Sequence, residues 1–208
     1  MRTLSLPESI ELAKKYGIEF AEYATARNEA ELGKACSKMG FPVAMKIISP
    51  KISHKTDSGG VKINIANPNE AKKEFTEMRK LRGFEGVLVQ EMLHGKEVII
   101  GGKRDVQFGP TVLFGLGGIY VEVFKDYNIG ICPLKKSDAR EMVQSLKSYP
   151  ILRGAREKRG VDLKAIEEAI LKVSKLMQKE KQVQELDLNP LIATSEGVKA
   201  VDARIIVE

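Results

Sequence analysis

Helical and strand-like spacings alternate along the first ninety residues. Ser5-Leu-Pro-Glu8 has the form of a capping box, and Gly17 follows the apolar stripe that it opens, which is typical of a short helix. The uninterrupted apolar run VAMKII is typical of a buried strand. In chain order this region predicts a helix from Ser5 to Gly17, a helix from Asn28 to Gly40, strands at 43–48 and 61–65, and a helix opened by Asn67-Pro-Asn69.

From Gly86 onward the pattern changes to short strands separated by turn residues. Turns at His94-Gly95 and Phe108-Gly-Pro110 indicate antiparallel neighbours. Strands are predicted at 86–93, 96–102, 111–115, 119–124 and 128–134, then a helix near Ser137, a longer helix from Asp162, and a closing β-hairpin of 183–194 with 198–207. This order predicts an α+β protein of two lobes with mostly antiparallel sheets.

The two lobes are expected to meet where the first strand-rich segment ends. The boundary is placed after residue 91, so that the N-terminal lobe is 1–91 and the C-terminal lobe is 92–208. A hinge is predicted near Gln90 to Leu93.

Composition limits the classes of protein that fit this pattern. No apolar run approaches about 18 residues, and the first residues lack the apolar core of a signal peptide, so no membrane association is expected. Cys36 and Cys132 are expected to be reduced thiols in a cytoplasm. The net charge is +6, but basic and acidic residues are interspersed, and the one basic cluster, Arg153 to Arg159, has no aromatic residue within it. Nucleic acid is therefore not an expected partner.

Two neighbouring features favour a phosphate site. Lys46 is the single charged residue of the apolar strand, and it is either an edge lysine that reaches solvent or a ligand for phosphate. The loop SHKTDSGGV follows, with His54, Lys55 and the pair Gly59-Gly60. It is either a polar turn or a loop whose backbone amides and Lys55 hold phosphate oxygens, which leaves His54 to accept a phosphoryl group.

The closing hairpin carries the most specific local pattern. Strand alternation puts Glu185, Asp187 and Asn189 on one face, and folding about Ser195–Gly197 brings Asn189 close to Asp202. Oxygen ligands without His or Cys suit Mg²⁺, which retains waters and phosphate oxygens as its other ligands. The alternative is a half-exposed polar face of the sheet.

Together these motifs resemble an ATP-grasp domain, in particular the nucleotide-binding β subunit of NDP-forming acyl-CoA synthetases such as the ADP-forming acetyl-CoA synthetases. The resemblance runs nearly end to end. The stretches that carry it are FPVAMKIISPKISHKTDSGGVKINI, GVLVQEML, KEVIIGGKRDVQFGPTVLFGLGGIYVEV, ELDLNPL and AVDARI.

The resemblance implies a role for each matching position. Lys46 matches the strand lysine that contacts the nucleotide phosphates. The hinge whose backbone meets adenine is matched by Gln90, Glu91, Met92 and Leu93. Glu97 matches the acidic residue that contacts the ribose. Asn189 and Asp202 match the Mg²⁺ ligands. Asp187 matches the residue that orients a phosphohistidine, and His54 matches the loop histidine that relays phosphoryl to ADP. Lys55 of the same loop is counted with the nucleotide-binding residues.

The resemblance also implies a reaction and a partner. Acyl-CoA and phosphate give an acyl phosphate on a separate α subunit, whose histidine passes the phosphoryl group to ADP bound with Mg²⁺ between the two lobes of this chain. The chain has no room for the domains that bind CoA and activate the acid, so these are expected on the α subunit, and an α2β2-type assembly fits the family. Two alternatives stay open: a carboxylate ligase that works alone, and a non-catalytic nucleotide sensor. The pattern does not identify the acid.

Overall fold

The computed structural model describes residues 1–208 except 53–54, 56–57, 119–120, 122 and 155–159. Contacts between residues divide the chain into two units. One comprises Met1–Phe20 together with His94–Glu208, and the other comprises Ala21–Leu93. Each unit has its own antiparallel sheet, and each is described by itself below.

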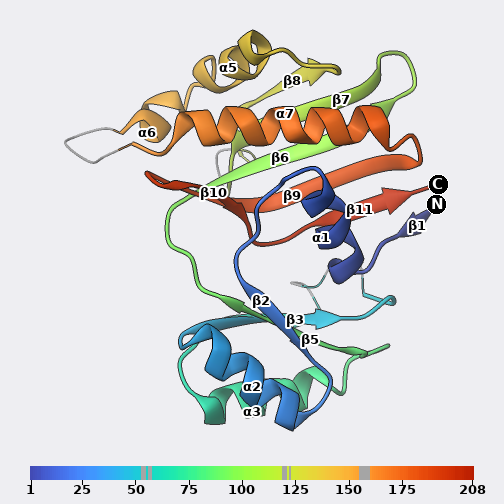
Figure 1. Cartoon of the computed structure of the whole chain (residues 1–208), viewed down its shortest axis with the longest axis vertical. Helices are drawn as coiled ribbons and strands as arrows, with labels where there is room; N and C mark the ends of the chain where they lie inside the picture. Colours follow the sequence, from blue (N-terminus) through green and yellow to red (C-terminus); the bar gives the residue numbers. More distant parts are fainter. Residues whose placement is uncertain (53–54, 56–57, 119–120, 122, 155–159) are drawn as a thin grey trace. The chain divides into compact units, whose positions relative to one another are not determined.

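The unit of residues 21–93 is a four-stranded sheet with two helices on one face (Figure 1). The strand order is β2-β5-β3-β4, and each neighbouring pair is antiparallel. Its elements are β2 (Tyr23–Ala26), α2 (Glu29–Met39), β3 (Val43–Ile48), β4 (Val61–Ile65), α3 (Pro68–Met78) and β5 (Gly86–Glu91).

Both helices of this unit begin where the sequence predicts. Asn28 accepts a hydrogen bond from the amide of Glu31, and Asn67 accepts one from the amide of Glu70, so each asparagine satisfies an amide that a helix start leaves unpaired. The helices bury Phe75 and neighbouring apolar residues against the sheet. Since strand side chains alternate, the residues of β3 that face this core are Val43 and Met45. Lys46 therefore lies on the opposite face of the sheet.

The other unit is a seven-stranded sheet in the order β1-β11-β9-β6-β7-β8, with β10 paired to β9. Its strands are β1 (Arg2–Thr3), β6 (Lys96–Asp105), β7 (Gly109–Leu116), β8 (Tyr127–Ile131), β9 (Val183–Thr194), β10 (Gly197–Ala200) and β11 (Arg204–Val207). Its helices are α1 (Leu6–Lys15), α5 (Lys136–Gln144), α6 (Tyr149–Arg153) and α7 (Leu163–Lys179).

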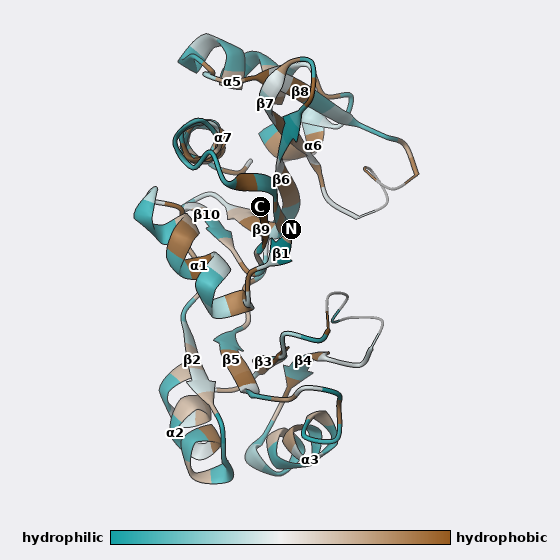
Figure 2. Cartoon of the chain, turned by 90° about the vertical axis from the view of Figure 1, so that its right-hand side faces the viewer, coloured by the Kyte–Doolittle hydropathy of each residue, from teal (hydrophilic) through white to brown (hydrophobic). Residues whose placement is uncertain are grey.

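Helix α7 covers one face of this sheet across β6 and β7 (Figure 1). Its apolar stripe, predicted from the sequence, is buried, and Figure 2 shows hydrophobic and hydrophilic residues on different sides of the helix. The helix lies close to the strand at Gly102, where an added Cβ would come within 2.7 Å of Met177. Arg104 then donates to the backbone carbonyls of Met177 and Glu180 at the end of the helix. The opposite face of the sheet stays open for the candidate site.

The division into units differs from the predicted lobes in the first twenty residues. The sequence places them in the lobe 1–91, but β1 pairs with β11 through Arg2–Val207 and Thr3–Ile206, and they belong with the C-terminal residues. Helical spacing in α1 shows that a helix buries one face, but it does not identify the sheet against which that face packs. The unit boundary lies between Leu93 and His94.

The strand predicted at 119–124 is wrong for the residues that the structure describes. Val121 is helical and Val123 and Phe124 form a turn. Gly118 has a φ of +63°, which turns the chain out of the sheet after β7. Val121 and Val123 therefore do not belong to a strand. The strands β1 and β2 and the short helix α6 were not predicted at all, because each is too short to show a period.

Within the described part of the chain, no helix is long and apolar enough to cross a membrane. Cys36 and Cys132 are both buried free thiols. Burial raises the pKa of each thiol, which disfavours the reactive thiolate.

Asp126 holds the segment before β8 against the start of α6. Its carboxylate is 7% exposed and accepts hydrogen bonds from the amides of Lys147 (3.0 Å) and Ser148 (2.7 Å). Burial alone would raise the pKa of Asp126, but the hydrogen bonds from Ser148 and Lys147 outweigh it and lower the pKa.

We predict that Asp126→Ala lowers the free energy of unfolding by about 2 kcal/mol near neutral pH, because two amides lose a charged acceptor. A urea titration measures this loss. Because the folded-state pKa is lowered, the carboxylate stabilises the fold above about pH 4 and ceases to do so as the pH falls through the folded-state pKa. The difference in unfolding free energy between wild type and variant should therefore shrink in acid.

Asp105→Ala is the control. Asp105 also accepts hydrogen bonds from two backbone amides but is not buried, so its loss is expected to have a much smaller effect. Equal losses for the two variants would contradict this account.

Candidate functional site

In the unit of residues 21–93, the structure brings Lys46 and Gln90 together. Lys46 Nζ donates to Gln90 Oε1 at 2.9 Å, and the two residues are 5% and 1% exposed. Lys46 pairs with Leu88 and Ala44 pairs with Gln90 across the ladder, so the two polar side chains lie diagonally on one face. A charged ammonium is costly to bury, and a lysine at the sheet edge that reaches solvent does not match this burial.

The residues that follow Gln90 form the predicted hinge. The amide of Glu91 donates to the carbonyl of Glu22 at 3.0 Å, and the Glu91 carboxylate accepts from the amide of Glu22 at 2.8 Å. The Glu91 side chain is thus engaged with the backbone of its own unit. Met92 and Leu93 are half-buried and continue the chain beyond β5.

The loop between β3 and β4 closes on itself at Lys55. The Lys55 carbonyl accepts from the amide of Gly60 (2.7 Å) and from the hydroxyl of Ser58 (3.1 Å). Gly60 admits no side chain, because an added Cβ would come within 2.5 Å of Ile47. His54, the predicted phosphoryl acceptor, lies outside the described residues, so its role stays a prediction.

The hairpin of β9 with β10 and β11 has the predicted geometry. Leu191 pairs with Ala200 and Asp187 pairs with Arg204 in one continuous register, so Asn189 and Asp202 fall opposite each other between these two pairs. Three oxygen-bearing side chains, those of Asp187, Asn189 and Asp202, therefore lie at neighbouring positions of one hairpin.

The acidic groups of this hairpin affect one another. The pKa of Asp187 is raised, and the largest cause is burial of its carboxylate. The negative charges of Asp202 and Glu185 raise this pKa further, while the positive charge of Arg204 lowers it without reversing the direction. Asp202 Oδ1 accepts from the amide of Ala203 at 2.9 Å. A cation bound here would relieve the repulsion between the carboxylates.

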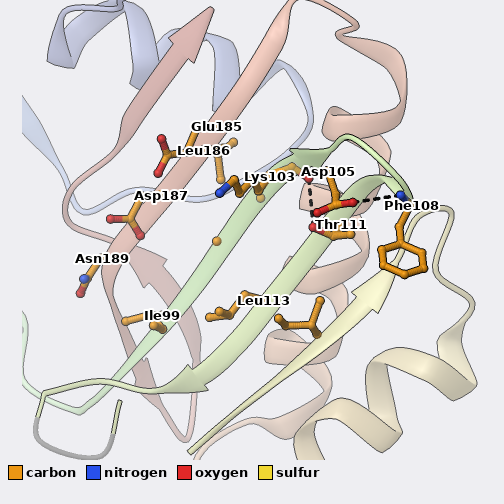
Figure 3. Close-up of a pocket in the computed structure, with 13 residues that line it drawn as sticks. Ile99, Lys103, Asp105, Phe108, Thr111, Leu113, Glu185, Leu186, Asp187 and Asn189 are labelled. Atoms are coloured by element: carbon orange, nitrogen blue, oxygen red, sulfur yellow. Dashed lines mark hydrogen bonds between the residues drawn. The ribbon is translucent and has the colours of Figure 1, made fainter. Parts of the chain in front are cut away.

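The open face of the same sheet forms a pocket of about 580 Å³ (Figure 3). Glu185, Asp187 and Asn189 line it from β9, and Ile99, Leu113 and Phe108 add apolar surface. Gly101 pairs with Asp187 across the ladder and has no side chain to fill the space beside it. The pocket therefore joins the polar end of β9 to an apolar area on β6, β7 and β8.

Glu97, predicted to meet the ribose, lies on β6 with its side chain exposed. Its carbonyl accepts from the amide of Gly117 at 2.8 Å. An added Cβ at Gly117 would lie 3.0 Å from Glu97 Cβ, so this glycine allows the glycine-rich segment to approach β6 closely.

A divalent cation suits the donors that the hairpin offers. Asp187, Asn189 and Asp202 provide only oxygen atoms, which are the ligands that Mg²⁺ prefers. In the described ranges no group of three or more His, Cys, Asp or Glu residues is arranged to hold a metal by itself. Any cation at the hairpin would therefore complete its shell with waters or with oxygens of a ligand.

Comparison with known families assigns the class of protein. The family model described as an ATP-grasp domain matches residues 1–207. The chain therefore belongs to the ATP-grasp domain family, which confirms the resemblance and the predicted α+β fold.

The particular relatives are subunits or parts of acid–CoA ligases. The chain is 46% identical over 214 residues to the β subunit of acetate–CoA ligase (ADP-forming) I of Pyrococcus furiosus, covering 99% of this chain and 92% of that protein. It is 44% identical over 209 residues to acetate–CoA ligase (ADP-forming) I of Archaeoglobus fulgidus, covering 96% of this chain but 30% of that longer protein.

Solved structures agree with these relatives. The chain matches dinucleotide-forming acetyl-coenzyme A synthetase 1 of Ca. Korarchaeum cryptofilum in complex with coenzyme A, Ca-AMPCP and HgCl⁺, with a TM-score of 0.94, 40% identity, and coverage of 100% of this chain and 94% of that chain. It also matches the complex of that protein with coenzyme A and Mg-AMPPCP, whose phosphohistidine segment points towards the nucleotide-binding site, with a TM-score of 0.87, 38% identity, and coverage of 100% and 93%.

Proposed function

We propose that this chain is the nucleotide-binding β subunit of an ADP-forming acid–CoA ligase. It transfers a phosphoryl group, by way of phosphohistidine, between an acyl phosphate and ADP, and so makes ATP, free acid and CoA in a reversible reaction. The observation that carries the proposal is the oxygen-rich hairpin of Asp187, Asn189 and Asp202 in a chain that aligns from end to end with such a subunit.

Each unit supplies its own part of nucleotide binding in this proposal. Lys46 is a buried ammonium that would balance the charge of the nucleotide phosphates, and the burial of its side chain supports this role. The backbone of residues 90–93 would meet adenine, and Lys55 would add a second cation near the phosphates. Glu97 would accept from the ribose hydroxyls.

Asn189 and Asp202 are the proposed ligands of Mg²⁺. The metal supplies charge neutralisation on the phosphoryl oxygens when it is bound. The opposed positions of the two residues and their all-oxygen chemistry support the assignment. Asp187, whose raised pKa reflects burial beside other carboxylates, would orient a histidine ring by accepting its N–H.

The proposed transfer uses two histidines in turn. On the partner, histidine nitrogen attacks the acyl phosphate, a P–N bond forms, and the carboxylate leaves. His54 of this chain then takes the phosphoryl group as the first P–N bond breaks. Finally a β-phosphate oxygen of ADP attacks phosphorus, which forms ATP and returns His54 to its neutral state.

A separate α subunit is the proposed partner, since the P. furiosus relative is a β subunit and the A. fulgidus relative is more than three times as long as the matched region.

Ile129 and Ile131 are 60% and 53% exposed on the edge strand β8, and Phe108 at the β6–β7 turn is 60% exposed. This apolar area is continuous with the pocket that ends at Asp187 and Asn189. It is therefore the surface proposed to receive the partner that brings phosphoryl to the pocket. The proposed assembly is of α2β2 type and acts in the cytoplasm.

We predict that Asp202→Asn removes the dependence of ADP binding on Mg²⁺, because one anionic ligand is lost while the side chain keeps its size. Isothermal titration with ADP in Mg²⁺ and in EDTA measures the effect. Glu185→Gln, at an exposed acid on β9 of the same hairpin, is the matched control and should keep the Mg²⁺ dependence. A variant that binds Mg·ADP as wild type does would remove Asp202 from the proposed ligands.

We predict that His54→Ala lowers ATP formation from acyl-CoA, phosphate and ADP by at least about a hundredfold when the α subunit is present, since the acceptor nitrogen is missing. ADP binding should be retained. The chain contains one other histidine, and His94→Ala is the control that should preserve turnover. Normal turnover by His54→Ala would exclude the relay.

We predict that Ile131→Asp weakens association with the α subunit by more than tenfold, because a charge is placed in an apolar interface. Size-exclusion chromatography of the mixed subunits measures it. Ile63→Asp is the control, because Ile63 is also an exposed isoleucine (61%) and lies on β4 in the other unit. Unchanged association of Ile131→Asp would place the interface elsewhere.

A further inference from the structure

The side chain of Gln90 is a buried polar group to which the sequence assigned no role, because only its backbone was expected at the hinge. Its Oε1 accepts from Lys46 Nζ at 2.9 Å. Its Nε2 is buried and has no hydrogen-bond partner among the residues that the structure describes. The amide is thus half satisfied, in a residue that is 1% exposed.

The orientation of this amide is determined by its neighbour. A lysine ammonium only donates hydrogen bonds, so the amide oxygen must face Lys46. The reversed amide would place N–H donors of both groups against each other. The two N–H groups of Gln90 are therefore directed away from Lys46 and need an acceptor from another source.

No side chain of the neighbouring strands accepts from Nε2 among the described residues. On the same face, Leu88 lies two positions before Gln90 in β5, and the ladder partners of Gln90 are Ala44 of β3 and Tyr23 of β2. Tyr23 carries a hydroxyl, but Nε2 makes no hydrogen bond to it. Leu88 and Ala44 are apolar and buried. A buried NH₂ group without a partner costs roughly 1–3 kcal/mol, and such groups in folded proteins commonly mark the place of a ligand or water.

We infer that Gln90 is a bifunctional nucleotide-binding residue: Oε1 fixes the direction of the Lys46 ammonium, and Nε2 donates to an acceptor atom of ADP or ATP. The inference rests on the proposed function, because it takes the nucleotide as the ligand near Lys46. An acceptor that carries no proton at neutral pH fits both donors. In the nucleotide, the phosphate oxygens and the ring nitrogens of adenine, N7 among them, are of this kind.

Two substitutions distinguish the role of the amide oxygen as an acceptor from the role of the amide nitrogen as a donor. Gln90→Met removes both hydrogen bonds at similar size. Gln90→Glu keeps an acceptor for Lys46 but replaces the donor with an anionic oxygen. Gln107→Met is the control, since Gln107 is exposed in the other unit. The Kd of Mg·ADP is measured by isothermal titration, and the melting temperature is measured without nucleotide.

We expect Gln90→Met to raise the Kd about tenfold, which corresponds to one lost hydrogen bond to a charged or strongly polar group. Gln90→Glu should raise the Kd further, although its melting temperature without nucleotide should equal or exceed that of Gln90→Met. A purely structural role predicts the reverse order of affinity, because glutamate would keep Lys46 in place. If Gln90→Met does not fold, Gln90→Glu against wild type gives the same decision.

An ADP analogue that carries carbon in place of N7, 7-deaza-ADP, identifies the acceptor. If N7 accepts from Gln90, wild type loses affinity for the analogue and Gln90→Met does not. If a phosphate oxygen or another ring nitrogen accepts, substitution of Gln90 weakens both nucleotides by the same factor.

The outcomes distinguish this inference from the proposed function. Wild type that fails to bind Mg·ADP would overturn both. If wild type binds Mg·ADP and the Kd of Gln90→Glu lies within twofold of the wild-type Kd, only the role of Gln90 is overturned.

Discussion

The continuous register of β9 with its neighbours is the constraint on which the C-terminal unit depends. This twelve-residue strand pairs with β6 on one side and with β10 and then β11 on the other. Because strand side chains alternate, a shift of one residue would move Asp187 and Asn189 to the face that packs on α7 and would bring leucines to the open face. The burial of Leu186 and Leu188 on the face opposite the pocket therefore also directs the acidic residues into the pocket.

Two adjacent glycines of β6 allow close helix packing on one face of this sheet and an open pocket on the other. Gly102 brings α7 close to β6 on the packed face, and Gly101 on the open face leaves space beside Asp187. The pocket that results is polar along β9 and apolar toward β8. Such a surface fits the proposed ligase, whose phosphoryl donor would arrive on another subunit: the oxygen-rich groups would meet the phosphoryl group through a bound cation, and the apolar residues would hold the protein that delivers it.

In the other unit, the comparable constraint is a buried charge. Lys46 lies in an apolar strand with its ammonium on the face opposite α2 and α3, and Gln90 is the neutral group that accepts from it. A carboxylate at position 90 could also accept from the ammonium, but it would offer no hydrogen-bond donor to a ligand. An amide accepts from Lys46 and adds a donor, which is a physical reason for glutamine at this position.

The sequence by itself determined the helices, most of the strands and the local chemistry. Capping residues such as Asn28 and Asn67 specify helix starts through their own side chains, and the two-residue period from Glu185 to Asn189 assigns a face by geometry alone. Tertiary structure decided the remainder, because it depends on partners distant in the chain. The pairing of β1 with β11 placed the first twenty residues in the C-terminal unit, and after the turn at Gly118 the residues Val121, Val123 and Phe124 do not form the strand that the sequence predicted. Likewise, the sequence marked Lys46 as unusual, but only the pairing of β3 with β5 showed that Gln90, 44 residues away, accepts a hydrogen bond from it.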